Sequence, residues 1–132
     1  MLTLNQIRDT LRPVLEKHRS TLRFAYLFGS LAEGNETPRS DVDLAVYVDG
    51  DPSRFNLDAK MGLHGDCCRA LGRDDVDLVV MNRTRNLLLL EQIVRTGQII
   101  WDQAPSSRIE FEAGVLHRAI DFKRQRFREM GL

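Results

Sequence analysis

The sequence is poor in cysteine, in net charge and in long apolar segments, and each of these features excludes a class of protein. The two cysteines, Cys67 and Cys68, are adjacent, so they cannot form an ordinary structural disulfide with each other, and they are too few for a zinc cluster. Lysine plus arginine and aspartate plus glutamate number 19 each, which gives a formal net charge of zero. General affinity for nucleic acid or for anionic membranes is therefore not expected.

The chain also lacks any apolar run long enough to span a membrane, and residues 1–12 lack the apolar stretch of a signal peptide. We therefore expect a soluble, cytoplasmic protein without membrane contact. The length of 132 residues favours a single domain over residues 1–132. A domain of this size buries roughly two-thirds of the surface that its unfolded chain exposes, so it folds without disulfides or structural metals.

Apolar spacing predicts a mixed α/β (α+β) fold, with a central sheet flanked by helices. Strands are expected over residues 24–28, 41–48, 76–81 and 98–102, and helices over residues 4–15, 53–71, 87–96 and 106–130. Thr3 is a candidate N-cap of the first helix, which Pro13 is expected to kink or break. In the second helix, one stripe is expected to face the core: Leu57, Met61, His64, Cys68 and Leu71.

The last predicted helix, capped by Ser106 or Ser107, is long and has two apolar stripes. One stripe contains Ile109, Ala113, Leu116, Ile120 and Phe127, and the other contains Phe111, Val115 and Phe122. One domain surface covers one stripe, so we expect a partner protein to cover the other; a helix wedged deep in the fold is the alternative. The basic residues of the last turns complement the helix dipole and require no nucleic acid.

Two aspartates one residue apart, Asp41 and Asp43, begin the predicted second strand. Alternate side chains of a strand share a face, so both carboxylates point the same way, roughly 6.6 Å apart along the backbone. Neighbouring carboxylates repel each other, and both ionise favourably only if a cation lies between them. Oxygen ligands of this kind suit Mg²⁺, which completes its octahedron with waters and substrate phosphates. The pair therefore predicts a site for a metal-bound nucleotide.

A Gly-Ser pair, Gly29-Ser30, ends the first predicted strand and is separated from Asp41 by ten residues. Gly29 has no Cβ to block a close approach of the backbone, and Ser30 offers a hydroxyl and an amide N–H, so the turn suits a phosphate. Residues 31–33 are expected to form a helical turn whose amides lie next to Ser30. Arg39 is a candidate for contact with a triphosphate, and a solvent-exposed loop position is the alternative.

A third acidic residue, Asp77, lies within the predicted third strand between apolar neighbours. A carboxylate there is unfavourable unless something pairs with it. If this strand lies beside the one that carries Asp41 and Asp43, the cluster could hold two Mg²⁺ about 3.5 to 4 Å apart for an in-line displacement. Asp75 shares the face of Asp77 and is the alternative, with Asp74 further back. We rank Asp77 first because it alone is surrounded by strand-forming residues.

The Gly29-Ser30 pair, the gap of ten residues and Asp41-Val42-Asp43 match the signature of the DNA polymerase β-like nucleotidyltransferase superfamily. The short chain and the residues around the motif most resemble the minimal nucleotidyltransferases, including the antitoxins paired with HEPN-type RNase toxins. The motif covers residues 29–43, and the general pattern extends over nearly the whole chain. Many minimal members carry an arginine near the position of Glu33. This sequence has an acidic residue there, which does not suit contact with a phosphate.

The resemblance implies a small nucleotidyltransferase fold whose third acidic residue lies on the following core strand, as Asp77 does. It implies ATP as donor, with two Mg²⁺ ions held by Asp41, Asp43 and Asp77. It also implies transfer of AMP to a tyrosine of a cognate HEPN toxin, which is neutralised in a hetero-oligomer.

Two other functions stay open. One is a binding antitoxin that masks its partner without catalysis, and the other is a nucleotidyltransferase for a small molecule such as an aminoglycoside. A chain of 132 residues has little room for a second domain to bind an acceptor. We therefore expect the acceptor on a partner protein.

Overall fold

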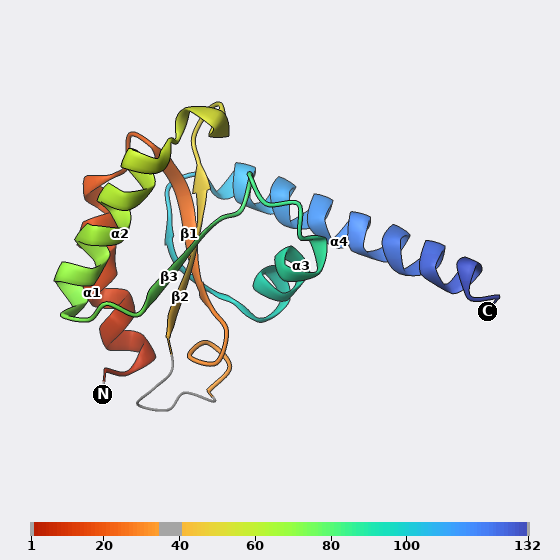
Figure 1. Cartoon of the computed structure of the whole chain (residues 1–132), viewed down its shortest axis with the longest axis horizontal. Coiled ribbons are helices and arrows are strands. Elements are labelled where there is room, and N and C mark those ends of the chain that lie inside the picture. Colours follow the sequence, from red (N-terminus) through yellow and green to blue (C-terminus); the bar gives the residue numbers. More distant parts are fainter. Residues whose placement is uncertain (1, 35–40, 132) are drawn as a thin grey trace.

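A four-stranded sheet lies at the centre of the computed structural model, which describes residues 2–34 and 41–131 (Figure 1). In chain order, the elements are α1 (Leu4–Lys17), β1 (Leu22–Phe28), β2 (Val42–Val48), the 3₁₀ helix η1 (Pro52–Arg54), α2 (Leu57–Leu71), β3 (Val76–Val80), α3 (Leu87–Thr96), β4 (Gln98–Asp102) and α4 (Pro105–Glu129). The predicted mixed α/β (α+β) fold is thus confirmed, including the long C-terminal helix.

The strand order is β3-β2-β1-β4, so β3 and β4 are the edges of the sheet. β1 pairs antiparallel with both β2 and β4, whereas β2 and β3 are parallel. The parallel pair is joined through α2, because parallel neighbours need a crossover connection. This crossover places the beginnings of β2 and β3 at the same end of the sheet, beside the end of β1.

The sheet has one hydrophobic core on each face, and helices cover both (Figure 1). α1 and α2 cover the first core, which includes Leu11, Leu44 and Leu63. α3 and α4 cover the second, which includes Tyr26, Ala45, Ile93 and Val115. The alternation along β2 follows from this, since Leu44 and Ala45 point to opposite faces.

α1 begins as predicted, and it ends at Lys17, with His18 as its C-cap. Thr3 forms a capping box with Gln6, in which each side chain accepts a hydrogen bond from the other residue's backbone N–H. The helix then continues through Pro13 to Lys17, so a break at Pro13 is not observed.

The prediction for α2 was wrong in its start and in its buried face. Its N-cap is Asn56, not Ser53, and the preceding residues form η1. Leu57 and Met61 are 71% and 59% exposed. The buried residues of the helix are Leu63, Cys67 and Leu71. The helix carries two apolar stripes about a quarter-turn apart, and periodicity alone does not choose between them.

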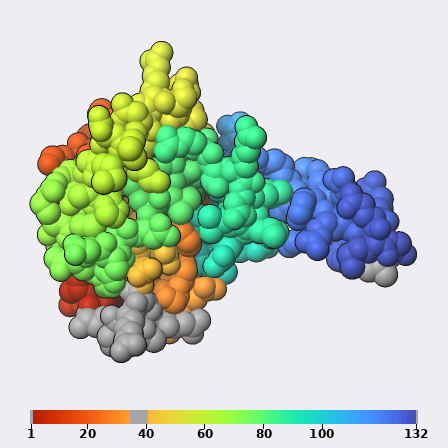
Figure 2. All heavy atoms as spheres, in the orientation of Figure 1, coloured from red at the N-terminus to blue at the C-terminus, as the bar shows by residue number. Residues whose placement is uncertain are grey.

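α4 begins one turn earlier than its predicted serine caps, with Pro105 in the first turn and Ala104 as N-cap. Val115 and Ala119 are buried, whereas every residue over 120–131 is exposed. The second half of the helix projects away from the rest of the molecule (Figures 1 and 2). Within the described part of the chain, no helix combines the length and apolar character needed to cross a bilayer.

Candidate active site

The structure brings Asp43 and Asp77 together on neighbouring strands. They are direct partners in the parallel pairing of β2 with β3. Because paired residues of adjacent strands point to the same face, their side chains lie side by side on strands roughly 4.8 Å apart. Ala45, two residues after Asp43, belongs to the core under α3 and α4, so the carboxylates lie on that face of the sheet.

Asp41 lies one residue before β2 and is exposed to solvent. Asp41 lies two residues before Asp43, so the period-two alternation of a strand predicts that the two side chains share a face. Besides burial, the negative charges of Asp77 and, to a smaller extent, Asp41 both raise the pKa of Asp43.

The Asp43 carboxyl has an unusually high proton affinity. Its pKa is raised from 3.8 to about 6, first by burial and then by the negative charges of Asp77 and Asp41. Burial and like charges both disfavour the ionised form. A cation placed among these carboxylates would offset the repulsion between their negative charges. The electrostatics of the site therefore favour a positively charged ligand.

Gly29 makes room for this carboxylate. It follows β1 with φ +76°, a conformation that favours glycine. A Cβ added to Gly29 would lie 3.1 Å from Cγ of Asp43 and would overlap its Oδ2. From the sequence, the missing Cβ of Gly29 was expected to allow the approach of a phosphate. The structure shows instead that the side chain closest to this position is the Asp43 carboxylate.

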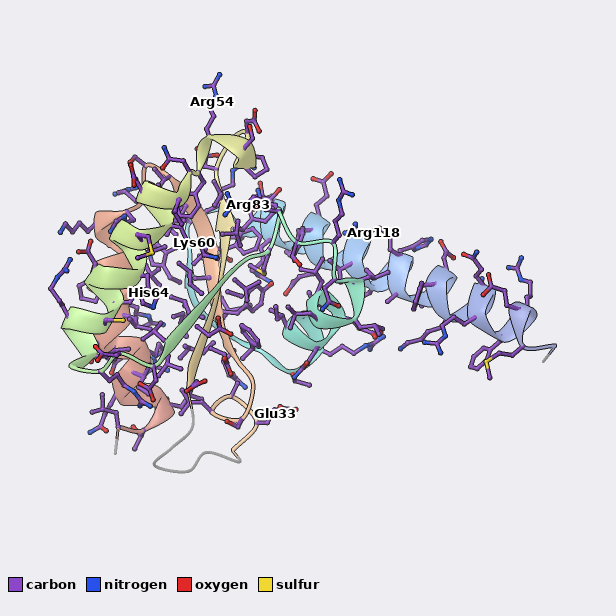
Figure 3. The ribbon with its side chains drawn as sticks, viewed as in Figure 1. Glu33, Arg54, Lys60, His64, Arg83 and Arg118 are labelled. Atoms are coloured by element: carbon purple, nitrogen blue, oxygen red, sulfur yellow. The ribbon has the colours of Figure 1, made fainter. Side chains whose placement is uncertain are left out.

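The residues after Gly29 form a hydrogen-bonded turn, as predicted. The Glu33 N–H donates to the Gly29 carbonyl at 3.2 Å, and Leu31 is buried beneath the turn. The Ser30 hydroxyl makes no hydrogen bond within the described residues and is partly exposed next to Asp43's strand. Glu33 is exposed (Figure 3). Arg39, the other candidate for nucleotide contact, lies outside the described residues.

Asp77 is exposed, contrary to the burial that its apolar neighbours suggested. β3 is an edge strand, so the side of Asp77 away from β2 has no neighbouring strand. The alternative residue, Asp75, lies before β3 and forms an ion pair with Arg73. The hydrogen bond from Arg73 lowers the pKa of Asp75, the opposite of the effect on Asp43.

The described residues contain no three histidine, cysteine or acidic side chains placed to hold one metal ion among themselves. Mg²⁺ does not require such a cage, because it commonly binds through one or two carboxylates, with waters and substrate phosphates as its other ligands. Asp43 and Asp77, which are paired across β2 and β3, could supply this carboxylate pair. The oxygen donor set therefore fits Mg²⁺ bound together with a nucleotide.

Two cationic residues beside β3 were not identified from the sequence. Lys60 of α2 and Arg83, which follows β3, lie beside the outer edge of β3 (Figure 3). His64 is half-buried, as expected for a core position, and its Nε2 lies 2.8 Å from the Val76 carbonyl oxygen. No local pattern marks Lys60 or Arg83, since their relation to Asp77 depends on the order of the strands.

Comparison with known proteins places these features in a family. A family model described as polymerase beta, nucleotidyltransferase matches residues 9–106. The protein adenylyltransferase MntA of Shewanella oneidensis is 33% identical over 100 residues. The aligned region is 76% of this chain and 66% of that protein, so the chain spans slightly less than two thirds of this curated relative.

Solved structures share the fold. A crystal structure of a toxin–antitoxin with AMP-PNP has a TM-score of 0.75 at 24% identity, covering 94% of this chain and 95% of that one. A complex of tri-AMPylated Shewanella oneidensis HEPN toxin with MNT antitoxin gives 0.71 at 22% identity, with coverages of 95% and 93%. Since the family model spans most of the chain and all the described candidate site residues, the chain belongs to the polymerase beta nucleotidyltransferase family.

Proposed function

We propose that the chain is an antitoxin-type protein adenylyltransferase, which transfers AMP from MgATP to a tyrosine hydroxyl of a cognate HEPN RNase toxin and thereby neutralises it. The observation that carries the proposal is the pairing of Asp43 with Asp77 on one face of the sheet, beside the Gly29 turn. Further support comes from the relative MntA, which is a protein adenylyltransferase, and from a similar fold found with an AMPylated HEPN toxin.

The chain's own residues have distinct roles in this reaction. Asp41 and Asp43 hold the metal, while the Ser30 hydroxyl and the amides of the following turn hold the β and γ phosphates, with Arg39 as a further contact. Asp77 orients the acceptor hydroxyl and takes its proton. The acceptor oxygen then bonds to the α phosphorus as the bond to the β phosphate breaks and pyrophosphate leaves. Bound Mg²⁺, which we propose as two ions, would neutralise the phosphate charge.

The proposed partner surface is the exposed stripe of α4, within a single domain over residues 1–132. Its apolar side chains Ile109, Ile120 and Phe127 are between 45% and 58% exposed. The opposite stripe is covered, since Phe111 packs against Phe24 and Tyr47. Phe122 was predicted on the same stripe as Phe111 but is 37% exposed, because α4 extends beyond the sheet at that point. An apolar stripe of this extent favours a hetero-oligomer.

The test is incubation of the chain with α-labelled ATP, Mg²⁺ and the protein encoded by the adjacent gene. We expect label on that protein, and loss of label with Asp41→Asn, Asp43→Asn or Asp77→Asn. Asp75→Asn is the matched control, because its carboxylate is bound to Arg73, and it should retain activity.

The same assay distinguishes the other functions. Toxin neutralisation that persists without label transfer would indicate an antitoxin acting by binding alone. Transfer to an aminoglycoside in the absence of any protein partner would indicate a small-molecule enzyme. Because the proposed donor is ATP and the proposed partner is an RNase, we expect the reaction to take place in the cytoplasm.

A further inference from the structure

In the described part of the chain, no strand lies beside the outer edge of β3, which runs past Asp77 (Figure 1). Two hydrogen bonds to β2 fix which backbone groups of β3 point outward. Val42 N–H donates to the Asp75 carbonyl at 2.9 Å, and Met81 N–H donates to the Val46 carbonyl at 2.8 Å. In a parallel ladder, alternate residues bond to the same neighbour, so the residues from 75 to 81 with odd numbers face β2. The N–H and C=O groups of 76, 78 and 80 face outward.

In this outward row, only the carbonyl oxygens of Val76 and Val80 have hydrogen-bond partners among the described residues. His64 Nε2 lies 2.8 Å from the Val76 carbonyl oxygen. The Val80 carbonyl accepts from the N–H groups of Arg83 and Thr84, both at 3.2 Å. Between these two carbonyls, the N–H and C=O of Leu78 and the N–H of Val80 have no hydrogen-bond partner among the described residues. The unpaired stretch is therefore short and begins one residue after Asp77.

Open grooves accompany the edge on both sides of Leu78. One, of about 190 Å³, is lined by Lys60, Met61, His64, Val76, Asp77 and Leu78. The other, of about 270 Å³, includes Lys60, Val80, Arg83, Thr84 and Leu89 along with Leu78. An extended chain places alternate side chains on opposite sides, so two adjoining grooves suit it better than one deep pocket would.

We propose that the acceptor segment of the partner protein binds in extended form along β3, as an added strand, with the acceptor residue opposite Asp77. This inference rests on the proposed function. Paired residues of adjacent strands share a face, so the acceptor side chain lies on the face that carries Asp77 and Asp43. The acceptor hydroxyl thus reaches the carboxylates from the open side of Asp77, while β2 occupies the other side.

The positive charge beside the outer edge of β3 determines which acceptor segments bind there favourably. Lys60 lines both grooves, and Arg83 lies at the far end of the strand (Figure 3). Cations beside an edge strand discourage indiscriminate pairing. A segment with an acidic side chain next to its acceptor residue would instead neutralise Lys60 on binding. The edge therefore fits an acidic acceptor segment.

Amide hydrogen exchange, measured by NMR on the labelled chain, tests the inference. The chain is measured alone and in complex with the unlabelled cognate toxin, Mg²⁺ and AMP-PNP. We expect the exchange of the Leu78 amide to slow about tenfold or more in the complex. The amides of Asp77 and Val79 face β2 and are the internal control, so their exchange should stay unchanged. An unprotected Leu78 amide in a formed complex would overturn the inference.

Charge reversal gives a second readout. Lys60→Glu should raise the KM for the toxin about tenfold with kcat and the KM for ATP unchanged, whereas Lys60→Arg should resemble the wild type. Arg54→Glu on η1 is the control for a change in net charge. Unchanged toxin KM in Lys60→Glu would contradict the charge argument. AMP transfer with an unprotected Leu78 amide would refute this inference alone, whereas absence of transfer by the wild type would refute the proposed function.

Discussion

Replacing Asp43 with asparagine should stabilise the fold while abolishing AMP transfer. The substitution keeps the shape of the side chain and removes its charge. The folded-state pKa of Asp43 is about 6, above its ordinary value of 3.8, because of burial and the charges of Asp77 and Asp41. Ionised Asp43 therefore destabilises the folded state. This destabilisation is complete above about pH 6 and is lost as the pH falls towards 3.8.

The size of the effect follows from the two pKa values. The difference between about 6 and 3.8 corresponds to about 3 kcal/mol for a fully buried carboxylate. Asp43 is partly exposed, so water screens much of this energy, and we expect Asp43→Asn to stabilise the metal-free chain by about 1 kcal/mol at pH 8. For a chain of this length, that corresponds to an increase in Tm of about 3 to 5 °C.

Thermal unfolding followed by circular dichroism, in metal-free buffer at pH 8 and at pH 4, measures this difference. Asp75→Asn is a matched control with the opposite expected sign. The hydrogen bond from Arg73 lowers the pKa of Asp75, so its ionised form stabilises the fold and the variant should be less stable at pH 8. The reasoning is refuted if Asp43→Asn is no more stable than the wild type at pH 8, or if its gain persists at pH 4.

Other substitutions test the surroundings of the site. Gly29→Ala should cost about 2 kcal/mol or more, because an L residue with positive φ is strained, and should abolish transfer by displacing the Asp43 carboxylate. Gly34→Ala has a similar φ of +75° but no atom within 4 Å of the added Cβ, so it should cost about 1 kcal/mol in urea unfolding and retain activity; equal losses in both variants would contradict the steric explanation. Tyr26→Phe removes a 2.7 Å hydrogen bond to Glu112 on α4 and should lower the free energy of unfolding by about 1 to 2 kcal/mol, whereas an unchanged urea midpoint would show that this bond does not anchor the helix.

The alternation of apolar residues predicted the strands well, and it predicted correctly that Asp43 and Asp77 share a face of the sheet. Period-two spacing and flanking turns placed β2 within one residue and β4 at its observed bounds. The same spacing, with an assumed neighbouring strand, put Asp77 beside Asp43, and the observed register does so. The strand bounds succeeded because they depend on alternation along a single strand, whereas the pairing of Asp77 with Asp43 also required β3 to lie beside β2.

Predictions that depended on packing were less successful. The buried face of α2 was misassigned, since Leu57 and Met61 face solvent while Leu63 and Cys67 face the core. The exposure of Asp77 was missed because the position of β3 at the sheet edge depends on strand order, which no local pattern encodes. The contact between Gly29 and Asp43 was missed for the same reason, since residues far apart in sequence meet only once β1 and β2 pair.

That contact has an evolutionary consequence. Any side chain larger than hydrogen at position 29 requires the Asp43 carboxylate to move, and a moved carboxylate loses its place beside Asp77. A side chain at position 29 is therefore compatible with the fold only when Asp43 changes as well. Among descendants of this chain, the loop and the acidic strand should be inherited or lost as one unit.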